Sequence, residues 1–405
     1  MQYLLLLIPF LLNSQINNLD DSELSFVNLE ANSIQFFNET SNLDNFYAKL
    51  DSLLKTKKGK VRILQIGGSH IQAEIWPDQL RKNFLFLSKE NELNGGRGFV
   101  FPFKIAETWN PKNHQISYSG KWEAYRNSMK KHQATWGVSG ITVTTKDSVS
   151  RLDIGYKHDS LTSYTFDRLK IFHEIGESSF DVNLISENPS DKTINNEMGY
   201  TEFRFNTTDS ISIVFNKTNE KQDHFTLYGL SFENDDPGIV YISVGVNGAK
   251  TSSFLRNELF VSQLESIKPD LVIFCLGIND AYNIKFCDTC YQENYDELVE
   301  WVKQVNPKTD LLFVTNNDSY YKQKYANTNV FKAREVMVNL AKKYHAGLWD
   351  LFEVMGGLDS VKKWEEEGYA KKDKIHFTNK GYQLVGDLMF VALMKQYNNY
   401  IKKED

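Results

Sequence analysis

Two kinds of apolar pattern alternate along the chain. Short, almost wholly apolar runs, typical of buried strands, lie at 61–66, 239–244, 271–276 and 311–315. Segments that we predict to be helices, several with apolar residues three or four positions apart, come between and after these runs, at 74–88, 251–267, 291–305, 331–343 and 380–396. Strands that alternate with helices predict an α/β domain whose parallel sheet is covered on both faces.

A different pattern occupies the middle of the chain. Between 109 and 236, short runs of alternating apolar and polar residues (141–144, 203–205, 211–215) are separated by clusters of Ser, Thr, Asn, Asp and Gly. Such short strands with turn signals between them are typical of a β-sandwich. We therefore predict an α/β domain in two parts, 58–108 and 237–401, interrupted by a β-rich insertion at 109–236.

The N-terminal region divides into two segments. Residues 3–12 form an apolar run of ten, too short to span a bilayer, and polar residues follow it. This pattern predicts a secretory signal peptide at 1–17 and a secreted or periplasmic protein; a buried N-terminal strand or helix is the alternative. No later segment reaches the length of a membrane span. The lead-in at 18–57 is polar and is expected to end in a helix, because Phe46, Leu50, Leu53 and Leu54 have helical spacing.

Composition and charge exclude several classes of protein. The 405 residues are 41% hydrophobic and 24% charged, which excludes a disordered chain, and the net charge of −6 without a Lys/Arg-dense block argues against nucleic-acid binding. The three cysteines are too few for a disulfide scaffold. Cys287 and Cys290 form a C-x-x-C pair that predicts a local disulfide in an exported protein, and Cys275 alone remains, so no metal site is expected. The sequence does not indicate an oligomeric state.

Candidate chemistry lies where strands end. In open α/β sheets, ligands bind beyond the carboxyl ends of the strands. Three predicted strands run into the loops 67–70, 245–248 and 277–280, and a fourth loop, 373–376, precedes the last helix. Together these loops supply a serine, glycine-rich turns, an Asn amide and an Asp/His pair, which is the set of groups that acyl transfer requires.

The chemistry assigns a role to each group. Ser69 is the candidate nucleophile, His376 the base that takes its proton, and Asp373 the carboxylate that orients the imidazole. The tetrahedral oxyanion would be bound by the backbone N–H groups of Ser69 and Gly248 and by the side-chain amide of Asn279. Taken singly, each piece could be only a turn, an Asx loop or a surface ion pair; the prediction rests on their order and placement.

The four loops, in this order, resemble the conserved blocks of the SGNH (GDSL-type) hydrolases. IGGSHIQ at 66–72, GVNGA at 245–249, GIND at 277–280 and DKIH at 373–376 resemble the first to the last block. The resemblance implies a three-layer α/β/α fold, a Ser69–His376–Asp373 triad, an oxyanion hole that includes Gly248 and Asn279, and no cofactor. One departure is Gly68, where the family usually has Asp, which puts the rigidity of the Ser69 loop in question.

A narrower resemblance, to bacterial peptidoglycan O-acetylesterases, rests on residues 69–72, the segment 95–99 and the inserted module, which resembles a carbohydrate-binding sandwich. It implies an esterase that removes O-acyl groups, in particular acetyl, from peptidoglycan or another polysaccharide. The alternatives are an O-acetyltransferase and a non-catalytic glycan-binding envelope protein. His70 is expected either to contact substrate or to pack the loop, Arg97 either to bind an acidic sugar or to form a salt bridge, and exposed Trp residues would favour sugar binding.

Overall fold

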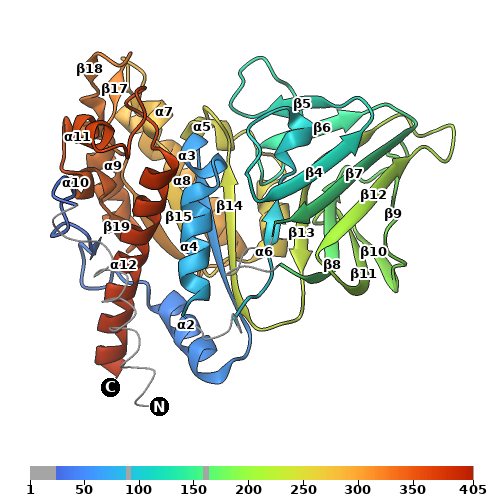
Figure 1. Cartoon of the computed structure of the whole chain (residues 1–405), viewed down its shortest axis with the longest axis horizontal. Coiled ribbons are helices and arrows are strands. Elements are labelled where there is room, and N and C mark those ends of the chain that lie inside the picture. Colours follow the sequence, from blue (N-terminus) through green and yellow to red (C-terminus); the bar gives the residue numbers. More distant parts are fainter. Residues whose placement is uncertain (1–23, 88–92, 158–163, 405) are drawn as a thin grey trace.

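The computed structural model describes residues 24–87, 93–157 and 164–404, so the predicted signal peptide lies outside the described residues. A six-stranded sheet in the order β1-β19-β16-β15-β2-β14 forms the centre of the α/β domain (Figure 1). Its strands are β1 (Ile34–Gln35), β2 (Lys60–Gly67), β14 (Gly238–Gly245), β15 (Leu271–Cys275), β16 (Asp310–Val314) and β19 (Gly347–Trp349). All are parallel except β1, which pairs with β19 in the antiparallel sense.

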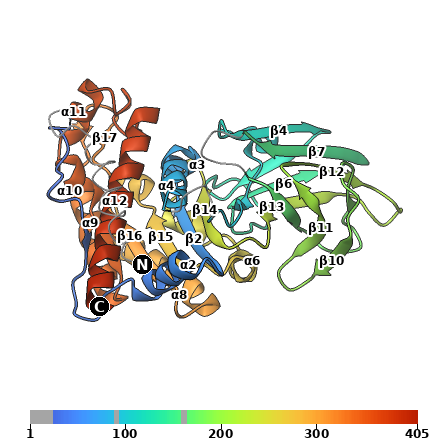
Figure 2. The same ribbon diagram turned by 60° about the horizontal axis from the view of Figure 1, so that its bottom comes forward.

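Helices cover both faces of this sheet. The strands are buried on both sides, and successive apolar residues point to opposite faces. Ile63 belongs to the core that contains α2 (Asp44–Thr56), α4 (Ile75–Leu85) and α12 (Asn379–Glu404). Leu64 belongs to the core that contains α6 (Phe260–Ile267), α8 (Asp288–Val305) and α9 (Asn329–Lys343). The predicted three-layer α/β/α fold is thus confirmed (Figure 2).

Short elements fill the connections. They are α3 (Ser69–Gln72), α5 (Thr251–Phe254), α7 (Ile278–Ala281), α10 (Leu351–Met355), α11 (Ser360–Glu366) and the hairpin of β17 (Tyr320–Tyr321) and β18 (Tyr325–Ala326). Among the described residues, no helix is both long enough and apolar enough to cross a bilayer.

The insertion consists of two packed antiparallel sheets. The larger contains β3 (Gly98–Val100), β5 (Glu123–Arg126), β6 (Ile141–Thr145), β8 (Phe166–His173), β10 (Asp191–Asn195), β11 (Tyr200–Thr208) and β13 (Phe225–Glu233). The smaller, in the order β4-β7-β12-β9, contains β4 (His114–Ser119), β7 (Val149–Tyr156), β12 (Ser210–Asn216) and β9 (Asp181–Leu184). Their inner faces share one apolar core, in which the rings of Phe215 and Phe225 stack 4.3 Å apart. A one-turn 3-10 helix, η2 (Phe103–Ala106), leads into the smaller sheet.

The structure differs from the predicted elements in three places. The strand β3 lies before the expected boundary at 109 but pairs with β13, so the insertion sheet begins near residue 98. The two-residue β1 has no recognisable pattern in the sequence. The helix expected at 251–267 is broken into α5 and α6, because the break contacts the insertion: Leu259 N–H donates to the Trp136 carbonyl, and the Asn127 amide donates to Asn257.

Candidate active site

The candidate nucleophile lies at the carboxyl end of a central strand. Ser69 begins α3 directly after β2, which is flanked by β14 and β15. Gly68 separates strand from helix, and a Cβ added to it would lie 3.3 Å from the Asn279 side-chain nitrogen. Because glycine has no side chain, the amide of Asn279 can lie beside the backbone that leads into Ser69.

The structure brings the Ser, His and Asp predicted from the sequence into one hydrogen-bonded chain. Ser69 Oγ lies 2.8 Å from His376 Nε2, and His376 Nδ1 lies 2.9 Å from Asp373 Oδ2. The side chains of His376 and Asp373 are about one-third exposed, at 31% and 36%. This arrangement lets the imidazole accept the serine proton on one side while the carboxylate holds its other N–H.

Backbone hydrogen bonds fix the loop that carries Asp373 and His376. Asp373 Oδ1 accepts the N–H groups of Ile375 and His376, each at 2.9 Å. Partial burial alone would raise the pKa of Asp373, but the hydrogen bonds from the His376 side chain and from these two backbone groups outweigh it and hold the pKa well below its usual value. The carboxylate is therefore ionised throughout the neutral range.

A neighbouring loop supports this one. Asn317, in the loop after β16, donates its side-chain amide to the Ile375 carbonyl at 3.0 Å, and Tyr320 N–H donates to the Lys374 carbonyl at 2.9 Å. This supporting loop, 316–319, was not predicted from the sequence. The signal that could have indicated it is the run of four polar residues directly after a buried strand.

The predicted oxyanion donors lie on two adjacent loops. Gly248 has φ +77°, a conformation that favours glycine, and a Cβ added there would meet no atom within 4 Å. Its backbone thus faces open space. Asn279, in α7, donates its side-chain amide to the Ala249 carbonyl at 3.0 Å, which ties the third loop to the second.

Gln72 joins the nucleophile helix to the oxyanion loop, a role that sequence analysis did not assign. Its side-chain oxygen accepts the Asn247 N–H at 2.6 Å, and its amide donates to Thr108 Oγ1 at 3.1 Å and to the Trp109 carbonyl at 3.4 Å. The side chain is 1% exposed. One buried amide therefore connects α3, the residue before Gly248 and the segment that enters the insertion.

Asp280 has a supporting place in the site. It is buried, and its carboxylate accepts the Thr251 hydroxyl at 2.8 Å and the Thr251 backbone N–H at 3.2 Å. Burial raises the pKa of Asp280, and this increase outweighs the lowering by these hydrogen bonds. The contact anchors α7, and with it Asn279, to α5.

His70 and Arg97 lie in the interior. For His70 the structure shows loop packing: it is 7% exposed, its Nδ1 lies 3.0 Å from the Tyr382 hydroxyl, and its ring lies 5.1 Å from that of His376. Burial, and secondarily the nearby His376, lowers the pKa of His70 to about 3, so the ring is neutral. Neither side chain is placed to meet a substrate from solvent.

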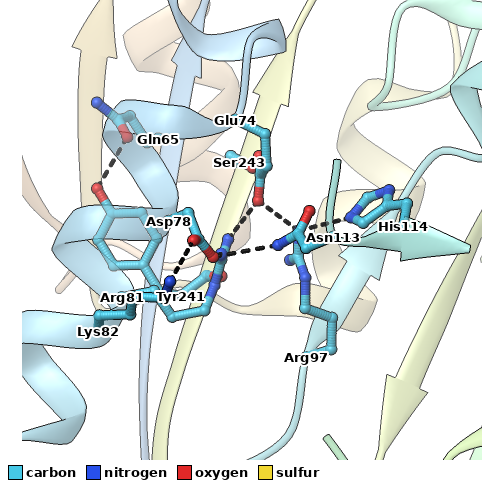
Figure 3. Close-up of polar contacts among 10 residues, drawn as sticks. All are labelled: Gln65, Glu74, Asp78, Arg81, Lys82, Arg97, Asn113, His114, Tyr241 and Ser243. Carbon is cyan, nitrogen blue, oxygen red and sulfur yellow. Dashed lines mark hydrogen bonds and ion pairs between the residues drawn. The ribbon is translucent and has the colours of Figure 1, made fainter. Parts of the chain in front are cut away.

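Of the two roles expected for Arg97, binding an acidic sugar or forming a salt bridge, the structure shows the salt bridge. Its Nη2 lies 2.5 Å from Glu74 Oε1, and Arg81 Nη2 approaches the same oxygen at 2.6 Å (Figure 3). Ser243 donates to the other Glu74 oxygen, and Arg97 Nη2 also lies 3.4 Å from Nε2 of His114, the first residue of β4. All three charged side chains are below 5% exposed. This buried cluster connects the turn after α3 with β14 and the insertion.

The cysteine prediction is also confirmed in the structure. Cys287 and Cys290 form a disulfide at the start of α8, where Cys287 is the N-terminal capping residue. Cys275 is unpaired in β15.

Comparison with known proteins identifies the fold. A solved structure of a peptidoglycan O-acetylesterase superimposes with a TM-score of 0.73 at 20% identity, covering 90% of this chain and 99% of that chain. Residues 209–384 match the GDSL-like lipase/acylhydrolase family. Over these residues, and in its fold, the chain resembles the SGNH hydrolases. The family match includes Gly248, Asn279, Asp373 and His376, whereas Ser69 precedes it.

Other solved SGNH structures align over a smaller part of the chain. An acetyl xylan esterase shares 20% identity over 39% of this chain and 82% of that chain, with a TM-score of 0.32. A GDSL-like lipase from Parabacteroides merdae shares 16% identity over 39% and 74% of the two chains, also with a TM-score of 0.32. No curated protein matches the sequence.

Proposed function

We propose that this protein is an SGNH hydrolase, an exported serine esterase that removes O-acetyl groups from a glycan. The observation that carries the proposal is the hydrogen-bonded chain from Ser69 through His376 to Asp373. The acetyl group and the glycan are supported by the shared fold with a peptidoglycan O-acetylesterase, and export by the apolar run at 3–12.

The reaction follows from the geometry in two stages. Ser69 Oγ attacks the ester carbonyl while His376 Nε2 takes its proton; the oxyanion is held by the N–H groups of Ser69 and Gly248 and by the Asn279 amide. The tetrahedral intermediate collapses, the sugar oxygen leaves with the proton from His376, and acetyl-Ser69 remains. Water, deprotonated by His376, then attacks the acyl carbon, and acetate leaves as Ser69 recovers its proton.

The first experiment tests catalysis. The wild-type chain is expected to hydrolyse p-nitrophenyl acetate, and Ser69→Ala to lose at least about a thousandfold of that rate, because members of a triad act as a unit. Ser52→Ala, an exposed serine in α2, is the matched control and should retain the wild-type rate. Equal rates for Ser69→Ala and wild type would reject the esterase and leave a glycan-binding protein on a hydrolase fold.

The second experiment tests the substrate. Acetate release from acetylated peptidoglycan, xylan and alginate is compared, and the polymer that is deacetylated fastest identifies the class of substrate. Transfer of acetyl to an added oligosaccharide, faster than release of free acetate, would instead identify an O-acetyltransferase, since the same residues serve both reactions. Mass analysis of the protein recovered outside the cytoplasm should show the loss of residues 1–17.

A further inference from the structure

The outer face of the smaller insertion sheet has a polar floor. The sheet register aligns Ser117 of β4 and Ser212 of β12 on either side of Asp153 of β7. Both serine hydroxyls donate to the Asp153 carboxylate, at 2.9 and 2.5 Å, and Arg151 Nε donates to it at 2.6 Å. Side chains on the outer face of a sandwich commonly point into solvent independently; here they are linked into a fixed row.

A hollow lies over this polar floor. In the next row Gly155 lies between Gln115 and Ser210, so the central strand contributes no side chain there. A groove of about 950 Å³ lies over the two rows. Its volume is at the upper end of the range for ligand pockets, and it is open along the sheet, which suits an extended ligand rather than a compact one.

The groove is locally basic in an acidic protein. Among the described residues that line it, the cations are Lys104, Lys112, Arg151 and Lys157, and the one carboxylate is Asp153. Lys112 and Lys157 are exposed, and neither forms an ion pair with any described residue. Because the whole chain carries a net charge of −6, this positive surface is a local feature that favours an anion bound in the groove.

A second hollow adjoins the groove. It has a volume of about 380 Å³ and shares Pro111, Lys112 and Lys157 with the first. Its walls include Ala73, directly after the helix that begins at Ser69, and Trp109, a residue that is 50% exposed. They also include the carboxylates of Glu74 and Asp78, which form ion pairs with Arg97 and Arg81. An exposed indole is suited to stacking on the apolar face of a sugar ring.

We infer that the two hollows form one binding groove for a glycan chain that carries carboxylates. The inference rests on the proposed function, since the groove would hold the polymer whose ester reaches Ser69. The serine and glutamine side chains of the floor would meet sugar hydroxyls, and Lys112 and Lys157, at the junction of the hollows, would pair with carboxylates. With a neutral glycan, these two cations would have no ionic partner among the residues that the structure describes.

Binding is measured on the full chain with Ser69→Ala, so that no polymer is hydrolysed. The probes are polygalacturonate and the same polymer fully methyl-esterified, compared by titration calorimetry at low and at 0.3 M salt (about 10 and 6 Å of screening length). Polygalacturonate is expected to bind and the esterified polymer not. Lys112→Gln with Lys157→Gln should weaken binding about five- to tenfold, the sum of two exposed ion pairs.

The matched control removes the same charge elsewhere. Lys332→Gln with Lys402→Gln changes two exposed lysines on α9 and α12 and should leave binding as it was. Equal binding of both polymers, equal loss in both double variants, or no binding of either polymer would overturn the inference. Thermal unfolding verifies that each variant is folded. Hydrolysis of p-nitrophenyl acetate by the wild type reports on the proposed function by itself, so failure of one proposal is distinguishable from failure of the other.

Discussion

At the scale of single residues, Gln72 illustrates how precisely the site depends on a side chain outside the triad. The Asn247 N–H donates to the Gln72 side-chain oxygen and belongs to the residue before Gly248, so the position of the Gly248 N–H, the proposed oxyanion donor, depends on this one buried amide. A displacement of about 1 Å in such a group can cost about a hundredfold in rate.

We expect Gln72→Met to lower kcat for p-nitrophenyl acetate about 10- to 100-fold with a smaller change in KM, because the donor is displaced while the substrate still binds. Gln72→Glu keeps an oxygen that can accept the Asn247 N–H and should retain more activity than Gln72→Met. Steady-state kinetics of both variants provide the measurement. A Gln72→Met enzyme with wild-type kcat would show that the contact is only structural.

Residue types and order were sufficient to predict that Ser69, His376 and Asp373 form one hydrogen-bonded chain. Ser69, Gly248 and Asn279 follow parallel strands, and the carboxyl ends of parallel strands lie at one edge of a sheet. The interior positions of His70 and Arg97 could not be predicted, because they depend on Tyr382 and Glu74, which packing brings near and no sequence spacing indicates.

At the scale of elements, the loop 316–319 connects stability to the site. Asp318 is fully buried in this loop; one of its oxygens accepts the Val361 N–H at 3.0 Å, and the other has no partner among the described residues. Burial raises the pKa of Asp318 to about 6, partly offset by backbone hydrogen bonds. The adjacent Asn317 holds the loop that carries His376.

The raised pKa of Asp318 predicts a pH dependence of folding. Between about pH 4 and pH 6 the native state holds a proton on Asp318 that the unfolded state has lost, so this group makes the protein less stable as pH rises through that window. Asp318→Asn removes this effect, and the free energy of unfolding of the variant relative to wild type should increase by up to about 3 kcal/mol from pH 4 to pH 7. Urea unfolding at both pH values measures the difference; a constant difference would contradict the assignment.

Element boundaries were predictable where local patterning determines them. The apolar runs predicted β2, β14, β15 and β16. The helices predicted at 291–305 and 331–343 end at the same residues as α8 and α9. The break between α5 and α6 was not predictable, because it is imposed by Trp136 and Asn127 of the insertion.

At the scale of the whole molecule, the buried Glu74 cluster joins the insertion to the α/β domain. Glu74 comes from the turn before α4, Arg97 from the segment that leads into β3, and His114 from β4 (Figure 3). Burial, followed by the charges of Arg97 and Arg81, lowers the pKa of His114 well below its usual value, so Glu74 is the carboxylate that balances Arg97.

Glu74→Gln is expected to destabilise the protein by about 3–5 kcal/mol, since it leaves a buried guanidinium without its anion. Arg81 would keep Asp78, at 3.0 Å, but Arg97 would have no comparable partner among the described residues. Urea unfolding gives the free energy directly. Glu220→Gln, in a fully exposed position, is the control and should change stability by less than about 1 kcal/mol.

The division of the α/β domain by the insertion has a consequence for biosynthesis. Strand β2 lies between β14 and β15, and both of these strands are synthesised only after the whole insertion. Ser69 and His376, which form a hydrogen bond, are 307 positions apart in the sequence. A nascent chain can therefore complete its sandwich while the strand before the serine still lacks both neighbours. Contacts of this sequence separation form slowly. We therefore expect esterase activity to appear last during synthesis and folding. A chain released before its final helix is made should have no esterase activity.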